Sequence, residues 1–243
     1  MKKLLFIFIF CLSCFPQGTV AQDEVYRMEL GGGAGGSFYL GDANSKPFAH
    51  LGAMGGVLAR YIFNPRMALK GNLAIGHLSG QTGKTFFPAD ANSGTVEGGQ
   101  PGMATFKRNV IDFGVQFEFN FWGYGIGRGF EGYSRITPYM LFGAGVTLAP
   151  KPLKMNAGFN IPLGVGVKYK VKPRLNIGLE WSMRFTTTDK LDVSNADGVI
   201  LNDPYGVKSA MFKNKDCYSF TMLFITYDMF PKCMNCNNIK YVF

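Results

Sequence analysis

Residues 109–121 read NVIDFGVQFEFNF and alternate between two kinds of side chain. Every second residue is large and apolar: Ile111, Phe113, Val115, Phe117, Phe119 and Phe121. The residues between them are polar or small: Asp112, Gly114, Gln116, Glu118 and Asn120. An extended strand points successive side chains to opposite faces, so this stretch has an apolar face roughly 35 Å long at about 3.3 Å per residue. The question is whether that face meets a protein core or a lipid bilayer.

Similar alternation recurs along the chain. The complete set of segments spans residues 25–39, 50–63, 67–79, 106–121, 136–149, 157–171, 175–186 and 217–229. Strands of soluble domains usually have about 5–6 residues, whereas a membrane-spanning strand needs about 9–11. The last segment is apolar on both faces, which leaves its register open. The sequence predicts an all-β fold, an eight-stranded antiparallel up-and-down transmembrane β-barrel.

The connections between these segments alternate in length. On one side, 64–66 and 172–174 are tight Asn-Pro-Arg and Lys-Pro-Arg turns, and 122–135 is a Gly-rich connection. The connections on the other side span 40–49, 80–105, 150–156 and 187–216, and two of them are long. Short periplasmic turns opposite longer external loops are typical of outer-membrane barrels. Aromatic residues near the turns are expected to form an interfacial girdle: Tyr61, Phe63, Phe121, Trp122, Tyr124, Tyr139 and Tyr169.

If the apolar faces meet lipid, the polar faces line the barrel interior. We expect lipid contact from Phe113, Phe117, Phe119, Leu163, Val165, Leu179 and Trp181. The interior is expected to hold a charge network made of Glu29, Arg60, Lys70, Arg108, Asp112, Glu118, Lys168, Glu180 and Arg184. An eight-stranded barrel is just wide enough for side chains to fill, and unpaired buried charges are costly. We therefore predict a charge-paired plug, with a narrow ion path as the alternative. Candidate partners for Asp112 and Glu118 are Arg108, Lys70 and Arg184.

The N-terminus has the three-part pattern of a secretory signal peptide. Lys2 and Lys3 precede an apolar run over residues 4–15, and TVAQ offers a cleavage site between Ala21 and Gln22. The pattern divides the chain into a signal peptide at 1–21, a barrel at 22–230 and a periplasmic C-terminal tail at 231–243. The expected location is the outer membrane of a Gram-negative bacterium.

Composition and motifs argue against several functional classes. The formal net charge is +9, but the charges are dispersed and do not form the basic, aromatic-rich run of a nucleic-acid binder. The segment GGGAGG at 31–36 fits a dinucleotide pattern, yet an apolar strand follows it instead of the required helix. GQTGKT at 80–85 lacks the first glycine of a phosphate loop. We expect no nucleic-acid partner and no cofactor.

The tail and the strand ends carry the remaining residues with chemical potential. Cys233 and Cys236 form a CxxC pair that is a candidate for a local disulfide or a free pair of thiols, and structural zinc would need four ligands. His50 and His77 lie near loop-side strand ends, where Ser79 and the acids Asp42 and Asp189 could join a rim active site. Nothing in the sequence fixes their mutual geometry. We expect that the protein is not an enzyme and has no metal site. An enzyme with its active site at the rim of the barrel is kept as an alternative.

Several stretches carry a family resemblance: FYLGD at 38–42, RYIFNPRMALKGNLAIGHLSG at 60–80, NVIDFGVQFEFNF at 109–121, TPYMLFGAGV at 137–146 and IPLGVGVKYKVKPRLNIGLEWSMRF at 161–185. Together they resemble the outer-membrane barrel family that includes the PorG component of the type IX secretion system. The resemblance implies an eight-stranded barrel with a structural or docking role, anchored to a periplasmic ring of secretion subunits. By topology, the candidate contact surfaces are the turns 64–66, 122–135 and 172–174 and the tail 231–243. A stand-alone barrel for surface adhesion or envelope integrity is the alternative.

Overall fold

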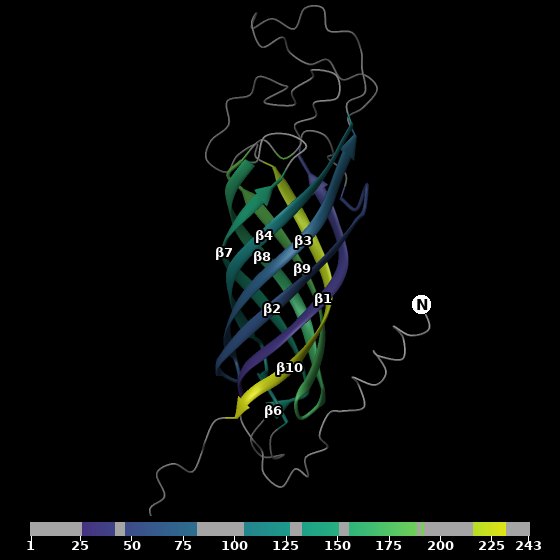
Figure 1. The fold of residues 1–243 in the computed structure, drawn as a ribbon. Coiled ribbons are helices and arrows are strands. Elements are labelled where there is room, and N and C mark those ends of the chain that lie inside the picture. Colours follow the sequence, from purple (N-terminus) through teal and green to yellow (C-terminus); the bar gives the residue numbers. More distant parts are fainter. Residues whose placement is uncertain are drawn as a thin grey trace, which may run out of the picture.

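A computed structural model describes residues 26–41, 47–81, 105–126, 133–150, 156–188, 191 and 216–231. These residues form a closed β-barrel of long, tilted strands (Figure 1). The barrel strands are β1 (Tyr26–Leu40), β2 (Gly52–Asn64), β3 (Met67–Gln81), β4 (Thr105–Asn120), β7 (Ile136–Ala149), β8 (Asn156–Lys172), β9 (Leu175–Thr186) and β10 (Cys217–Pro231). The predicted all-β, eight-stranded antiparallel barrel is confirmed.

The strands follow one another around the wall in the order β1, β10, β9, β8, β7, β4, β3 and β2, and each neighbouring pair is antiparallel. The barrel closes where β1 meets β10, from Tyr26 opposite Pro231 to Leu40 opposite Cys217. Closure leaves the wall with no unpaired edge strand, which a β-structure within a bilayer requires. We call the end with the tight turns the turn end and the opposite end the loop end.

The glycine-rich stretch of β1 forms part of this closure. In β10, Tyr218, Phe220, Met222 and Phe224 all point into the barrel, and Gly33 lies opposite Phe224. A Cβ on Gly33 would lie 2.8 Å from Met222 Cγ and 2.9 Å from Phe224 Cα. The lack of a side chain at Gly33 therefore makes room for the large side chains of β10. This packing explains why the last segment reads as apolar on both faces.

The described parts of the segment 122–135 are more structured than a plain connection. They contain two short strands, β5 (Gly123–Tyr124) and β6 (Tyr133–Ser134), which pair in parallel below the barrel. Tyr124 N donates to Pro65 O at 3.0 Å, and Gly125 N donates to Ser134 O at 3.1 Å. Tyr124 is thereby held against the β2–β3 turn at the turn end.

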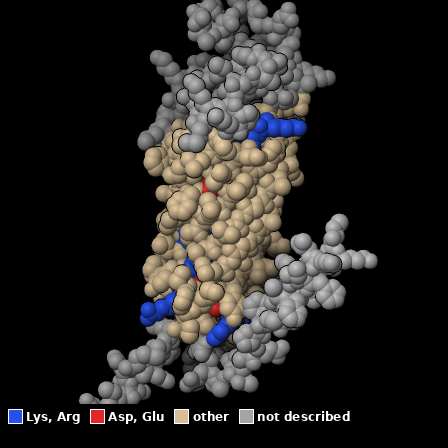
Figure 2. Space-filling view, viewed as in Figure 1, with Lys and Arg blue, Asp and Glu red and all other residues tan. Residues whose placement is uncertain are grey.

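The outer surface of the wall is apolar. On β8, the outward residues Leu163 and Val165 are 46% and 54% exposed, and on β4 Phe113 is 58% exposed. Phe117 and Phe119 point the same way and are half-buried, with Phe117 packed against Phe142 at 5.4 Å between ring centroids. In Figure 2, uncharged residues cover most of the described wall. An apolar exterior around a charged interior is the arrangement of a barrel that spans a membrane.

Two residues of the expected girdle, Tyr139 and Tyr124, are placed differently. Tyr61, Phe63, Phe121, Trp122 and Tyr169 are exposed near the turn end, as an interfacial girdle requires. The prediction for Tyr139 was wrong, because Tyr139 is buried inside the barrel with 1% of its surface exposed. A tyrosine suits either place, because its ring is apolar and its hydroxyl can form hydrogen bonds. Residue type alone therefore does not distinguish an interior tyrosine from a girdle tyrosine.

The described part of the chain contains no helix that is long and apolar enough to cross a membrane.

Candidate functional site

The barrel interior gathers the charged residues. All nine residues of the expected network lie inside and are at most 3% exposed: Glu29, Arg60, Lys70, Arg108, Asp112, Glu118, Lys168, Glu180 and Arg184. Lys170, Asp216 and Asp228 are buried with them. The buried charges of the described residues therefore comprise six acids and six bases, which makes the interior electrically neutral.

Glu118 is the centre of the larger cluster. Its carboxylate lies 2.7 Å from Arg60 Nε, accepts a hydrogen bond from Arg60 Nη2 at 3.0 Å, and accepts another from Lys168 Nζ at 3.1 Å. Lys70 Nζ is 3.6 Å away. Arg60 also pairs with Glu29, which accepts a hydrogen bond from Thr226 at 3.2 Å. Three bases thus surround one acid, and a second acid shares one of the bases.

The excess positive charge around Glu118 is balanced by Glu180. Lys70 Nζ donates to Glu180 Oε2 at 2.5 Å, and the hydroxyl of Tyr139 donates to the same oxygen at 2.7 Å. Lys168 lies above the ring of Tyr139, with its Nζ 4.9 Å from the ring centroid. Tyr139 therefore connects Glu180 to Lys168, the partner of Glu118, through one hydrogen bond and one cation–π contact.

Asp112 is the centre of a second cluster, nearer the loop end. Its carboxylate accepts hydrogen bonds from Asn72 at 3.0 Å and from Asn160 and Tyr218 at 2.8 Å each. Arg184 Nε lies 3.2 Å from Asp112 Oδ1, and the Arg184 guanidinium stands over the ring of Phe220. Of the partners proposed for Asp112 and Glu118, Arg184 contacts Asp112 and Lys70 contacts Glu118. Arg108 instead donates to the backbone carbonyl of Ala149 at 2.9 Å.

The turn end of the interior is covered by Tyr124. Its hydroxyl donates to Asn176 Oδ1 at 2.8 Å, and its ring lies 5.1 Å from Lys168 Nζ and 5.4 Å from Lys170 Nζ. Beside it, Lys170 donates to Asp228 at 2.5 Å. Burial of the phenol raises the pKa of Tyr124 well above its ordinary value, with a further contribution from the charge of Glu29. Tyr124 was expected in the girdle, but the parallel β5–β6 pair turns it inward.

The loop end of the interior is closed by packed, mainly apolar side chains. Tyr39 packs edge-to-face on Phe106, with the ring centroids 4.8 Å apart, and its hydroxyl donates to Asp216. The backbone of Leu191 donates to the other carboxylate oxygen of Asp216 at 2.8 Å. Leu191 is 1% exposed. The described residues thus cover the charged interior at both ends.

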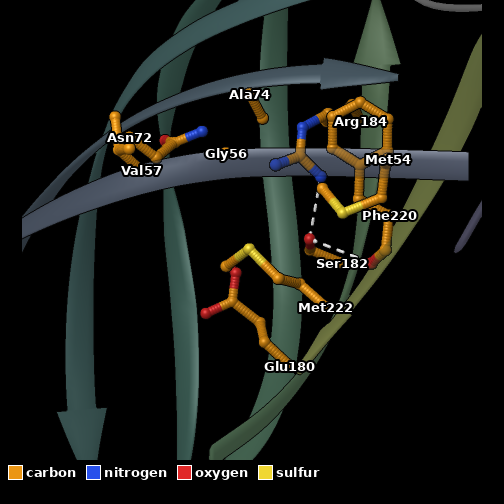
Figure 3. A pocket seen from close by; sticks show the side chains of 10 residues that line it. All are labelled: Met54, Gly56, Val57, Asn72, Ala74, Glu180, Ser182, Arg184, Phe220 and Met222. Atoms are coloured by element: carbon orange, nitrogen blue, oxygen red, sulfur yellow. Dashed lines mark hydrogen bonds between the residues drawn. The ribbon is translucent and has the colours of Figure 1, made fainter. Parts of the chain in front are cut away.

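A small cavity remains between the two clusters. Glu180, Ser182 and Arg184 of β9 line one side, and Met222 and Phe220 lie beside them (Figure 3). Arg184 Nη1 donates to Ser182 Oγ at 2.8 Å, which holds the guanidinium at the cavity wall. About 10 Å³ is open to the centre of a water molecule, which is the lower limit for holding one water. The cavity is too small for a hydrated ion.

The residues proposed for a rim enzyme do not form a shared centre among the described residues. Ser79 Oγ donates to the backbone carbonyl of His50 at 3.4 Å, and the ring of His77 contacts Asn109 at 2.8 Å. Asp42 and Asp189 lie outside the described residues. Within the part of the chain that is described, no group of three or more His, Cys, Asp or Glu side chains could hold a metal ion.

Two further predictions concern segments that the structure does not describe. Ala21 and Gln22, at the expected cleavage site, lie outside the described residues, as do Cys233 and Cys236 in the tail. Cys217, at the start of β10, is half-buried.

The sequence from residue 2 to residue 238 matches the model of a family described as a domain of unknown function, DUF6089. The chain belongs to this family. No curated protein matches the sequence.

Several solved structures are similar to the chain. Neisserial surface protein A, NspA, is 12% identical, with 83% of this chain and 97% of that chain covered at a TM-score of 0.46. The attachment invasion locus protein Ail of Yersinia pestis, solved with the heparin analogue sucrose octasulfate, is also 12% identical, with 84% and 99% covered at a TM-score of 0.44. The N-terminal β-barrel domain of OprF from Pseudomonas aeruginosa is 12% identical, with 84% and 98% covered at a TM-score of 0.42. These likenesses concern the β-barrel fold alone.

Sequence reasoning missed part of the interior. Asp228 was not expected there because the register of the last segment was open. Tyr218 was missed for the same reason, since it lies on that same segment. Lys170 lies two residues after Lys168 on the same polar face of β8, so the period-2 pattern was sufficient to find it.

Proposed function

We propose that the protein is a non-enzymatic outer-membrane barrel with a structural or docking role. The observation that carries this proposal is the filled interior, in which acids and bases pair across the lumen and packed side chains cover both ends. Binding and catalytic sites are usually concave pockets large enough for a ligand. The cavity between the two clusters has room for about one water molecule, which is too little for a solute or a substrate. The surfaces at the two ends of the barrel are then the functional parts.

The turn end is held in one conformation by hydrogen bonds, and this supports a docking role. Backbone hydrogen bonds tie each turn to a neighbouring strand: Asn120 N donates to Arg66 O at 2.7 Å, and Asp228 N donates to Arg174 O at 2.8 Å. Asn120 Nδ2 donates to Pro65 O at 2.9 Å. A surface that is already ordered loses little conformational entropy when a partner binds.

The candidate partners come from the resemblance to the barrel family that includes the PorG component. We propose that the turns 64–66, 122–135 and 172–174 and the tail 231–243 face the periplasm and anchor subunits of a type IX secretion ring. We also propose export through a signal peptide cleaved after Ala21. An intact mass that corresponds to a mature chain beginning at Gln22 would support the export step.

Site-specific crosslinking in the native host tests the docking role. A photoactivatable phenylalanine analogue at Tyr133, which is 40% exposed in β6, should capture a periplasmic secretion subunit. The matched control is the same analogue at Leu163, which is 46% exposed on the lipid-facing wall and should give no protein adduct. Absence of adducts from Tyr133 and from positions in both tight turns, in a folded barrel, would contradict docking and favour a stand-alone barrel. Replacement of His50 and His77 by Ala should leave the function intact, whereas a rim enzyme would lose its activity.

A further inference from the structure

The charges of the described residues are divided between the interior and the surface. All six acids in these residues are buried, whereas six of the bases are exposed. Lys107 is the exposed base at the loop end. The other five are at the turn end, and we call them the basic collar: Arg27, Arg66, Arg135, Lys172 and Arg174. Figure 2 shows basic side chains projecting at the lower rim of the barrel and at one place near the upper rim. Because the interior is neutral, the collar supplies most of the net charge of the described surface.

Hydrogen bonds fix the position of several collar residues. The carbonyl of Arg66 accepts from Asn120 N at 2.7 Å, and the carbonyl of Arg135 accepts from Lys170 N at 2.8 Å. The side chain of Arg174 is also held, because its Nε donates to the hydroxyl of Tyr26 at 2.6 Å and its guanidinium stacks on that ring. Hydrogen bonds at the turn end therefore fix the backbones of Arg66 and Arg135 and the side chain of Arg174.

The collar encircles the barrel. Arg27 is on β1, Arg66 is in the β2–β3 turn, Arg135 precedes β7, and Lys172 and Arg174 flank the β8–β9 turn. In the closed strand order these positions are distributed around the whole wall. Membrane lipid surrounds a barrel on all sides, whereas a protein that binds one side of the barrel would need cations on that side only. The circular arrangement favours lipid.

The neighbours of the collar also indicate the membrane interface. Phe63 precedes the turn that carries Arg66, and Val171 precedes Lys172; both are exposed on the outer wall. Trp122 is 52% exposed at the same end. Aromatic residues favour the level of the lipid headgroups, so the adjacent cations lie at the level of the phosphates. Four of the five collar residues are arginines, whose forked guanidinium matches a phosphate group.

We propose that the basic collar binds the phosphate groups of anionic phospholipids in the membrane leaflet at the turn end. The collar thereby fixes the depth of the barrel and holds the turns at the membrane surface. This inference does not depend on the docking role, because lipid would bind the collar of a stand-alone barrel equally well.

Native mass spectrometry of the folded full-length protein released from nanodiscs tests the proposal. The nanodiscs contain equal amounts of phosphatidylglycerol and phosphatidylcholine, and the retained lipids of each kind are counted. One cation near an anionic membrane changes binding about fivefold, so the wild type should retain phosphatidylglycerol with at least about a fivefold preference. The variant R27Q/R66Q/R135Q/K172Q/R174Q should show a preference close to one. Raised salt should weaken the wild-type preference, because screening acts on exposed charges.

Two variants serve as controls, and folding of each is checked by heat-modifiable migration on a gel. K107Q removes the exposed base at the other end and should keep the preference. The variant R27K/R66K/R135K/R174K keeps the charge and should retain more of the preference than the glutamine variant. Equal retention of both lipids by the wild type, or an unchanged preference in the glutamine variant, would overturn the proposal. An unchanged lipid preference combined with lost crosslinking from Tyr133 would instead assign the collar to an acidic protein partner.

Discussion

Arg60 of β2 and Glu118 of β4 pair across the inside of the barrel, although β3 lies between their strands in the wall. Two guanidinium nitrogens approach the two carboxylate oxygens, at 2.7 and 3.0 Å. Both side chains are at most 1% exposed. This forked geometry combines charge with direction, so it constrains how the strands are staggered as well as neutralising the interior.

Removal of the Glu118 charge is expected to destabilise the barrel strongly. In Glu118→Gln, Arg60, Lys168 and Lys70 remain buried with one acid fewer between them. Loss of one partner of a buried ion pair typically costs about 3–5 kcal/mol. Urea unfolding of the protein in lipid vesicles or detergent, followed by tryptophan fluorescence, measures the change in the free energy of unfolding.

A charge-restoring variant separates electrostatics from shape. Adding Lys168→Met to Glu118→Gln restores the balance of buried charge, so part of the lost free energy should be recovered. Lys107→Gln, at an exposed position, should change the stability by no more than about 0.5 kcal/mol. Equal stability of Glu118→Gln and wild type would show that the network does not hold the fold.

The lipid-facing wall predicts a depth-dependent penalty for charge. Val165 lies in the middle of the outward apolar row of β8, whereas Tyr169 is on the same face near the turn end. Val165→Arg should cost about 2–4 kcal/mol and Tyr169→Arg about 0–1 kcal/mol. The measurement is the free energy of unfolding from vesicles. Equal costs at the two positions would contradict a bilayer around this wall.

The contact between β1 and β10 predicts a contrast between two glycines of one strand. A Cβ on Gly33 would clash with Met222, Phe224 and the carbonyl of Leu223, so Gly33→Ala should cost about 1–3 kcal/mol. A Cβ on Gly36 would meet its nearest atom, Gly52 O, at 3.8 Å, so Gly36→Ala should be neutral or stabilising by up to about 1 kcal/mol. Thermal unfolding followed by gel migration compares the two variants. A greater loss in Gly36→Ala would contradict the packing described.

The wall of the barrel could be predicted from the sequence, because period-2 alternation decides which face of a strand is apolar. The pattern around Phe113 and Val165 was sufficient for this. The last segment was harder, because Phe220 and Phe224 fill space that glycines on β1 leave open. That match between small and large residues depends on the pairing of the first and last strands, far apart in the sequence.

Partners in the interior could be predicted only in part. Charge sign made Arg184 a candidate for Asp112, and the two are 3.2 Å apart. The Arg60–Glu118 pair was not expected, since contact across the lumen depends on strand tilt and stagger, which local patterns do not reveal. The inward turn of Tyr124 depends likewise on the β5–β6 pair, whose two short strands carry no alternation of their own.

Ion conductance across a planar lipid bilayer tests the filled interior most directly. The purified, folded wild-type protein should show no steady conductance, because paired charges occupy the lumen and the cavity between them is too small for a hydrated ion. The same preparation should show heat-modifiable migration, which establishes that the barrel is closed. A stable, reproducible conductance from that preparation would contradict the filled interior and, with it, the proposal that the ends of the barrel carry the function.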